Sequence, residues 1–274
     1  MIAWKLRRWR TAGVAAAALG VAACGGEAGE AGGEQGESGG EAGVSGGEAG
    51  ERGAPATAAS AGGEAGEAGA ASAYAGLSGD QLTALRIQHL KGFVMAAARV
   101  NAGDQPAEAA VLVQQGLLEV YDIAPDQFGD LDIAVIRAAA DANLNRAQMM
   151  QRIRNAEAEM DRAVGGLDEV DHAVLVVRMV DIATGLYQGV VQPDFVDPVE
   201  YQHSMGAAIA ARSALTQGQG AMQRQNLRGY AEAQAELNRL VDLWPQATAP
   251  ERPASYQQVL AQSSRVRLAL SPFL

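Results

Sequence analysis

The sequence predicts an all-α fold, an alanine-rich antiparallel bundle of about seven or eight helices. Alanine fills many expected core positions, which lets neighbouring helices approach closely. No segment alternates apolar and polar residues between turns, as a half-buried strand would. Apolar residues instead recur at the spacing of one helical face, and the clearest stripe is Leu82, Leu85, His89, Phe93, Ala96 and Val100.

Capping residues and helix breakers delimit the helices of the first half. Ser78 and Gln81 have the spacing of a capping box before the first helix. Pro106 suits the first turn of the second helix, because its missing N–H has no helical partner there. The pair Gly165 and Gly166 is typical of a helix C-terminus and ends the fourth helix.

The second half is delimited in the same way. Asp197, Pro198 and Glu200 form a second capping arrangement, and Pro245 and Pro272 stop the last two helices. The expected helices therefore span 80–101, 106–121, 131–142, 146–164, 168–189, 198–215, 226–244 and 255–270. Two segments, 80–121 and 168–215, each contain two helices joined by a turn with Asp and Pro, which indicates two related hairpins.

The formal charge of −11, from 21 basic and 32 acidic residues, is unevenly distributed. Residues 1–23 carry +4, residues 25–79 carry −8 and residues 80–274 carry −7. These zones define a leader (1–23), a glycine-rich linker (24–79) and a helical domain (80–274). The acidic balance argues against nucleic-acid binding, which normally needs a basic face.

The leader has the pattern of a secretory signal, a basic start followed by a short apolar run. Its end, Leu19-Gly20-Val21-Ala22-Ala23-Cys24, resembles the lipobox of bacterial lipoproteins. The resemblance implies cleavage before Cys24 and lipidation of that residue, which is the only cysteine of the chain. With Gly25 in place of Asp, it favours the outer membrane, with the domain facing the periplasm. The alternative is an ordinary secretory signal with a chance cysteine.

The linker repeats a seven-residue unit of the type GGEAGEA. No large apolar residue occupies a fixed position in the repeat, and three glycines per unit oppose a helix, so a coiled coil is excluded. We therefore expect residues 24–79 to be a disordered tether that carries the domain away from a membrane. Calcium binding by its glutamates is the alternative.

Histidines and carboxylates provide the candidate metal site. Glu200 and His203, like Glu169 and His172, have the i, i+3 spacing that places both side chains on one helical face. Two such pairs plus two further glutamates form the di-iron site of carboxylate bundles. A looser site for iron or copper would use His89, Glu200 and His203. The alternatives are that these histidines are core or surface residues, and that Glu200 belongs to a helix cap.

Signatures of enzymes are absent from the sequence. It contains no His-Glu-x-x-His, no Gly-x-Ser-x-Gly and no phosphate-binding loop. Lys91 is the only lysine of residues 80–274, and no Gly-rich turn precedes it. The methionines are interpreted as gap fillers of the core, with a copper site as the alternative. The sequence therefore predicts a protein that is not an enzyme.

Short motifs resemble two groups of bacterial envelope proteins. The segment 189–202, with Gly189 and Val191 ahead of Glu200-Tyr201-Gln202, resembles helical extracytoplasmic domains associated with high-affinity iron permeases. The segments 88–94, 240–245 and 264–271 resemble helical lipoproteins related to imelysin. The resemblance implies an all-helical periplasmic fold with a link to metal acquisition, although the Arg-Glu-Gly-Leu-Glu and Gly-x-His-x-x-Glu motifs of these families are absent.

The combined prediction is a lipid-anchored, helical binding or accessory module of the cell envelope. Its expected partners are the membrane, through Cys24, and a metal-uptake permease or another envelope protein. The alternative is a structural or scaffolding lipoprotein without a small ligand.

Overall fold

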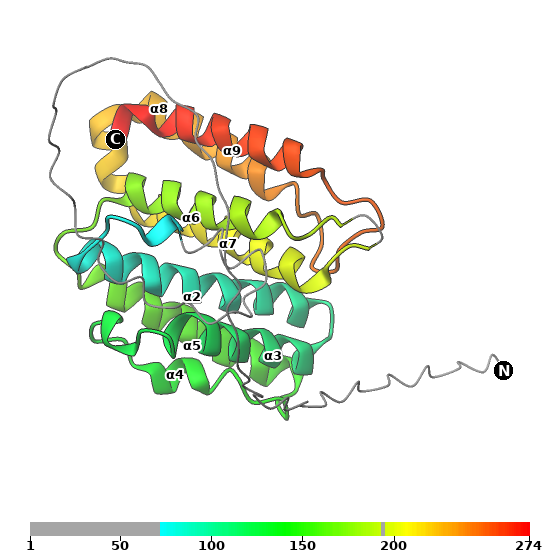
Figure 1. Ribbon diagram of the computed structural model, residues 1–274. Coiled ribbons are helices and arrows are strands. Elements are labelled where there is room, and N and C mark those ends of the chain that lie inside the picture. Colours follow the sequence, from blue (N-terminus) through cyan, green and yellow to red (C-terminus); the bar gives the residue numbers. More distant parts are fainter. Residues whose placement is uncertain (1–71, 193–194) are drawn as a thin grey trace, which may run out of the picture. The chain divides into compact units, whose positions relative to one another are not determined.

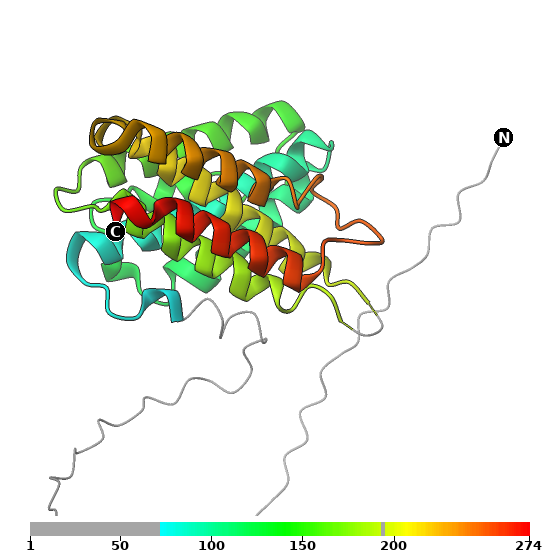
Figure 2. The ribbon, with the colours of Figure 1, turned by 90° about the horizontal axis from the view of Figure 1, so that it is seen from above.

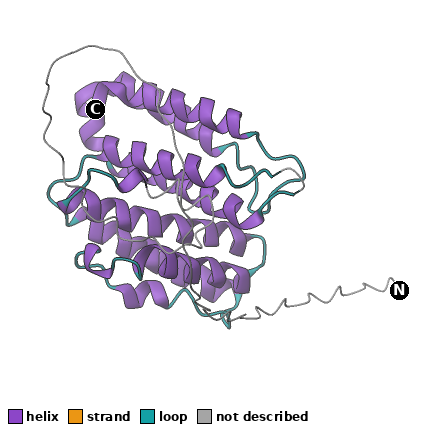
Figure 3. Ribbon diagram, viewed as in Figure 1, coloured by secondary structure: helices purple, strands orange, loops and turns teal. Residues whose placement is uncertain are grey.

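The computed structural model describes residues 72–192 and 195–274, and in them the chain forms eight α-helices (Figure 1 and Figure 3). An isolated bridge between Val191 and Val196 is the only β pairing of this part. The predicted all-α bundle is thus confirmed. The helices are α2 (Gly79–Ala102), α3 (Pro106–Gly116), α4 (Ile133–Arg137), α5 (Arg146–Gly165), α6 (His172–Tyr187), α7 (Pro198–Gln217), α8 (Gln219–Val241) and α9 (Tyr256–Leu270).

The signal segment, Cys24 and the linker up to residue 71 lie outside the described residues. The described part begins at Ser72, eight residues before the expected start of the domain. A short 3₁₀ helix, Ser72–Tyr74, packs against α6, and Ala73 is buried. The helical domain therefore includes the last residues of the predicted tether.

The helices pack in layers around a central antiparallel pair, α2 and α7 (Figure 1). α3 and α5 contact α2 on one side, and α6 and α8 contact α7 on the other. α9 completes the bundle by packing on α6 and α8. Both predicted hairpins are present, α2 with α3 and α6 with α7, and they meet through the central pair.

Glycine allows the central pair to approach closely. A Cβ on Gly92 would lie 3.1 Å from the carbonyl carbon of Gly206, and a Cβ on Gly206 would overlap the carbonyl oxygen of Gly92. Around this crossing the two helices bury small side chains, including Ala96, Ala207 and Ala210. The Ala-rich core predicted from the sequence is therefore the means by which α2 and α7 come into contact.

Several helix ends follow the predicted chemistry. Asp197 accepts hydrogen bonds from the backbone N–H groups of Val199 and Glu200, so the predicted cap of α7 is confirmed. The predicted capping box at Ser78 is wrong, because its side chain makes no capping hydrogen bond. Gln81 instead pairs with the backbone of Asp171, which holds the start of α6 against α2.

Three predicted helices differ in length from the observed ones. The segment 131–142 contains only the five-residue α4, and 106–121 ends in a π-helical turn from Leu117 to Tyr121. α8 begins at Gln219, ahead of the predicted residue 226, and Asn226 forms a kink within it. Its side chain accepts a hydrogen bond from the N–H of Gly229 and caps the second part of the helix. None of the helices in the described residues combines the length and apolar character needed to cross a bilayer.

Candidate functional site

Two histidines lie buried at the crossing of α2 and α7. The sequence Gln-His-x-x-Gly occurs in both helices, as Gln88-His89 before Gly92 and as Gln202-His203 before Gly206. Residues three apart share a helical face, so each imidazole lies on the face that meets the other helix. His89 is 8% exposed and His203 is 6% exposed. Both rings pack against Phe93, with centroid distances of 5.6 and 4.6 Å respectively.

His89 is held by the short 3₁₀ helix at the start of the described residues. The hydroxyl of Tyr74 lies 2.6 Å from Nδ1 of His89, and the guanidinium of Arg86 lies 4.2 Å from the Tyr74 ring centroid. The Nε2 atom of His89 is buried without a hydrogen-bond partner among the described residues. Burial, then the nearby His203 and Arg86, lowers the pKa of His89 to about 3.

His203 contacts α3 and the π-helical turn that follows α3. Its Nε2 lies 3.2 Å from Oε1 of Gln115, and its Nδ1 lies 3.8 Å from a carboxylate oxygen of Glu119. Burial lowers the pKa of His203 to about 4, although Asp197 acts in the opposite direction. Both buried histidines are therefore neutral at neutral pH, which is the form that binds metals.

The structure does not gather the predicted metal ligands into one group. Glu200 is buried on α7 with its side chain against Gly189, just beyond the end of α6. Among residues 72–192 and 195–274, no three His, Cys, Asp or Glu side chains lie close enough together to hold a metal ion. His89 and His203 thus both pack against Phe93, and no third metal-binding side chain lies near them.

A buried lysine joins three helices at a second polar cluster. Lys91, whose side chain is 3% exposed, places Nζ 2.5 Å from Oδ1 of Asp161 and 2.7 Å from Oγ of Ser213. A serine beside a lysine is a nucleophile–base pair in some hydrolases. Here the lysine also forms an ion pair with the carboxylate of Asp161. The cluster therefore braces α2 against α5 and α7.

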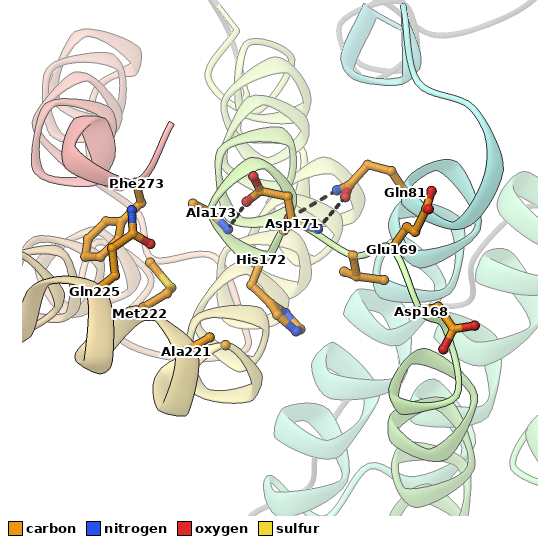
Figure 4. A pocket seen from close by; sticks show the side chains of 12 residues that line it. Gln81, Asp168, Glu169, Asp171, His172, Ala173, Ala221, Met222, Gln225 and Phe273 are labelled. Carbon is orange, nitrogen blue, oxygen red and sulfur yellow. Dashed lines mark hydrogen bonds between the residues drawn. The ribbon is translucent and has the colours of Figure 1, made fainter.

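An open pocket of about 470 Å³ lies at the start of α6 (Figure 4). Three acidic residues, Asp168, Glu169 and Asp171, line it, and no lysine or arginine does. Apolar and neutral polar side chains form the rest of its wall. These other lining residues are Gln81, Val170, His172, Ala173, Gly218, Ala221, Met222, Gln225 and Phe273.

Backbone hydrogen bonds shape the acidic rim of the pocket. Oδ2 of Asp80 accepts from the N–H groups of Asp168 and Glu169, at 2.9 and 3.2 Å. Asp171 caps α6 by accepting from the N–H groups of Ala173 and Val174. The loop before α6 is therefore held at both ends, and Asp168 and Glu169 are exposed on it.

His172 forms one wall of the pocket, against the junction of α7 and α8. A Cβ on Gly218 would lie 2.5 Å from Cβ of His172, so this position needs glycine. Burial lowers the pKa of His172 below its ordinary value, while Asp171 opposes the shift. The sequence had paired His172 with Glu169, and both line the pocket. The sequence did not predict that Met222 and Phe273 line the same pocket, because they lie 50 and 101 positions after His172.

Comparisons with family models, curated proteins and solved structures find no match for this chain. The resemblances to lipoproteins, to iron-permease-associated domains and to imelysin-related proteins therefore stay predictions.

Proposed function

We propose that the chain is a lipid-anchored binding or accessory module of the bacterial cell envelope, not an enzyme, and that its helical domain takes a small cation in the pocket beside α6. Cys24 would carry the anchor, with the domain in the periplasm and the outer membrane as the favoured site. The observation that carries the proposal is a pocket lined by three acidic residues and by no lysine or arginine.

The chemistry of the pocket favours a cation over an anion. The carboxylates of Asp168 and Glu169 attract positive charge, while Met222 and Phe273 supply apolar contacts for the body of an organic ligand. A metal ion would have at most two of these side chains as ligands, because no three His, Cys, Asp or Glu side chains of the described residues lie close enough together to hold one. Such a module would suit a metal-uptake permease as its partner, as the sequence resemblance implies.

Calorimetric titration of the mature chain tests the ligand. The probes are ferrous, ferric, cupric and zinc ions, and a diamine as the organic cation. We expect binding of one probe class that is weakened about tenfold or more when Asp168→Asn and Glu169→Gln are combined. The control, Glu251→Gln in the exposed α8–α9 loop, should leave affinity unchanged. Absence of binding by every probe would contradict the proposal and favour a structural lipoprotein.

The anchor is tested separately in the native host. Replacement of Cys24 by Ser should move the protein from the membrane fraction to the soluble fraction, because the acyl chains would be lost. Retention of the variant in washed membranes at high salt would contradict lipidation at this residue.

A further inference from the structure

Charge is divided unequally between the two parts of the helical domain. Residues 72–218 contain ten basic and nineteen acidic residues, a net charge of −9. Residues 219–274, which form α8 and α9, contain six arginines and four acidic residues, a net charge of +2. The last two helices are therefore a basic region on an otherwise acidic domain.

The α8–α9 pair forms the outermost layer of the bundle beyond α6 and α7 (Figure 1). Figure 2 views this layer from above, with the two helices side by side. Gln262 donates to the carbonyl of Glu236, and Gln225 donates to the carbonyl of Pro272, so the helices are antiparallel. In this register Leu227 and Leu268 lie near the same end of the pair.

Leucines on this layer point away from the core. Leu227 is 66% exposed and Leu268 is 74% exposed, and Leu260 and Leu274 are also exposed. Arg228 adjoins Leu227, where its 90% exposed side chain also pairs with Glu232 one turn on, and Arg265 lies three residues before Leu268. We define the basic–apolar face by these exposed side chains: Leu227, Arg228, Leu260, Arg265, Leu268 and Leu274.

Other parts of the domain expose either large apolar side chains or arginines, but not both. α3 exposes Val111 and the π-helical turn after it exposes Leu118, yet residues 106–123 contain three acidic residues and no arginine or lysine. α5 exposes Arg152 and Arg154, but none of its large apolar side chains is exposed. Among the described helices, only α8 and α9 present exposed leucines together with arginines.

We propose that the basic–apolar face binds an anionic phospholipid surface. Leucines separated by arginines and small polar residues suit the interface of a bilayer, where leucine enters the acyl boundary and arginine meets lipid phosphate. A protein interface would need a contiguous apolar centre, and Arg228 and Ser264 interrupt the leucines here. The contact does not depend on the proposed ligand. It rests on the proposed anchor only in that lipidation would keep the domain near a membrane.

Vesicle sedimentation with the mature chain carrying Cys24→Ser tests this face without an acyl anchor. We expect binding to phosphatidylglycerol vesicles that is lost with added salt, and at least tenfold weaker binding to phosphatidylcholine. Arg228→Gln with Arg265→Gln should weaken binding about 25-fold, since each arginine near an anionic surface contributes about 1 kcal/mol, or about fivefold. Leu227→Gln with Leu268→Gln should weaken it about tenfold or more.

Matched controls come from the two regions that expose either an apolar side chain or an arginine, but not both. Leu118→Gln in the π-helical turn after α3, where the leucine is 64% exposed, and Arg154→Gln on α5 should leave vesicle binding unchanged. Equal losses in these controls, or no binding to anionic vesicles, would overturn the proposal. A dimer in solution that Leu227→Gln and Leu268→Gln dissociate, without vesicle binding, would assign the face to a second copy and also overturn it. None of these outcomes bears on cation binding or on lipidation, which the calorimetric and fractionation experiments measure.

Discussion

The α2–α7 crossing and the pocket beside α6 both contain histidine, but they offer it to very different surroundings. His89 and His203 are nearly inaccessible and pack against Phe93. His172 is half-buried in a cavity with carboxylates on its rim. The difference teaches that residue type and spacing do not identify a ligand site, because access and the sign of the local charge decide it.

The largest expected effect is a loss of stability on acidification. The folded pKa values of His89 and His203, about 3 and 4, lie below the ordinary value of about 6.5. The unfolded chain therefore takes up protons first, so stability is complete above about pH 6.5 and falls as pH drops toward 4. Urea unfolding should show a slope of about 1.4 kcal/mol per pH unit for each histidine. A flat profile between pH 6.5 and 5 would contradict the burial of both rings.

The crossing itself is tested by Gly206→Ala. The added methyl group would overlap the carbonyl oxygen of Gly92, so α2 and α7 must separate. We expect the free energy of unfolding to fall by about 3 kcal/mol. Gly220→Ala is the control, because the atom nearest its new Cβ is 3.6 Å away at the end of Arg224. Equal effects of the two changes would disprove the close approach.

The sequence predicted the helices better than the sites, for physical reasons. Helix periodicity and caps are local, so the apolar stripe of α2 and the Asp197 cap were predicted correctly. The predicted helix start at 226 coincides with the kink, where the Asn226 side chain caps the second part of α8, whereas the helical segment 219–225 before the kink was not predicted. The contact of Lys91 with Asp161 and Ser213 joins residues 70 and 122 positions apart, which no local pattern reveals.

The pocket was missed for a related reason. Its wall comes from the start of α2, the loop before α6, the start of α8 and the C-terminal Phe273. The sequence indicated a ligand-binding role for two of its residues, Glu169 and His172, as a metal-binding pair. The repeat Gln-His-x-x-Gly was present in the sequence. It was a usable signal for the central crossing, because glycine near an apolar helix face permits close packing.

A smaller effect is expected at the lysine brace. Asp161→Asn leaves the ammonium of Lys91 buried without its carboxylate, and we expect a loss of about 2 kcal/mol, because Asp161 is half-exposed. Lys91→Met, which removes the buried charge, should cost less than Asp161→Asn in the same urea titration. The reverse order would show that packing of the lysine stem, and not its charge, holds the three helices.

The smallest effect concerns the helix that forms one wall of the pocket. Asn226→Ala removes the side-chain acceptor for the N–H of Gly229 and should destabilise the domain by about 1 kcal/mol. Asn238→Ala, at an exposed position of the same helix, should change stability far less. If Asn226→Ala has no effect in thermal unfolding, the kink is not stabilised by this cap.

The central claim is that the pocket, and not the buried histidine pair, receives the cation. Calorimetric titration with whichever probe the mature chain binds tests it most directly, on two variants side by side. Asp168→Asn with Glu169→Gln should abolish or strongly weaken binding, whereas His203→Gln should leave the affinity unchanged while lowering stability. Loss of binding in His203→Gln, with the pocket variant unaffected, would contradict this claim and would place the cation site at the crossing of α2 and α7.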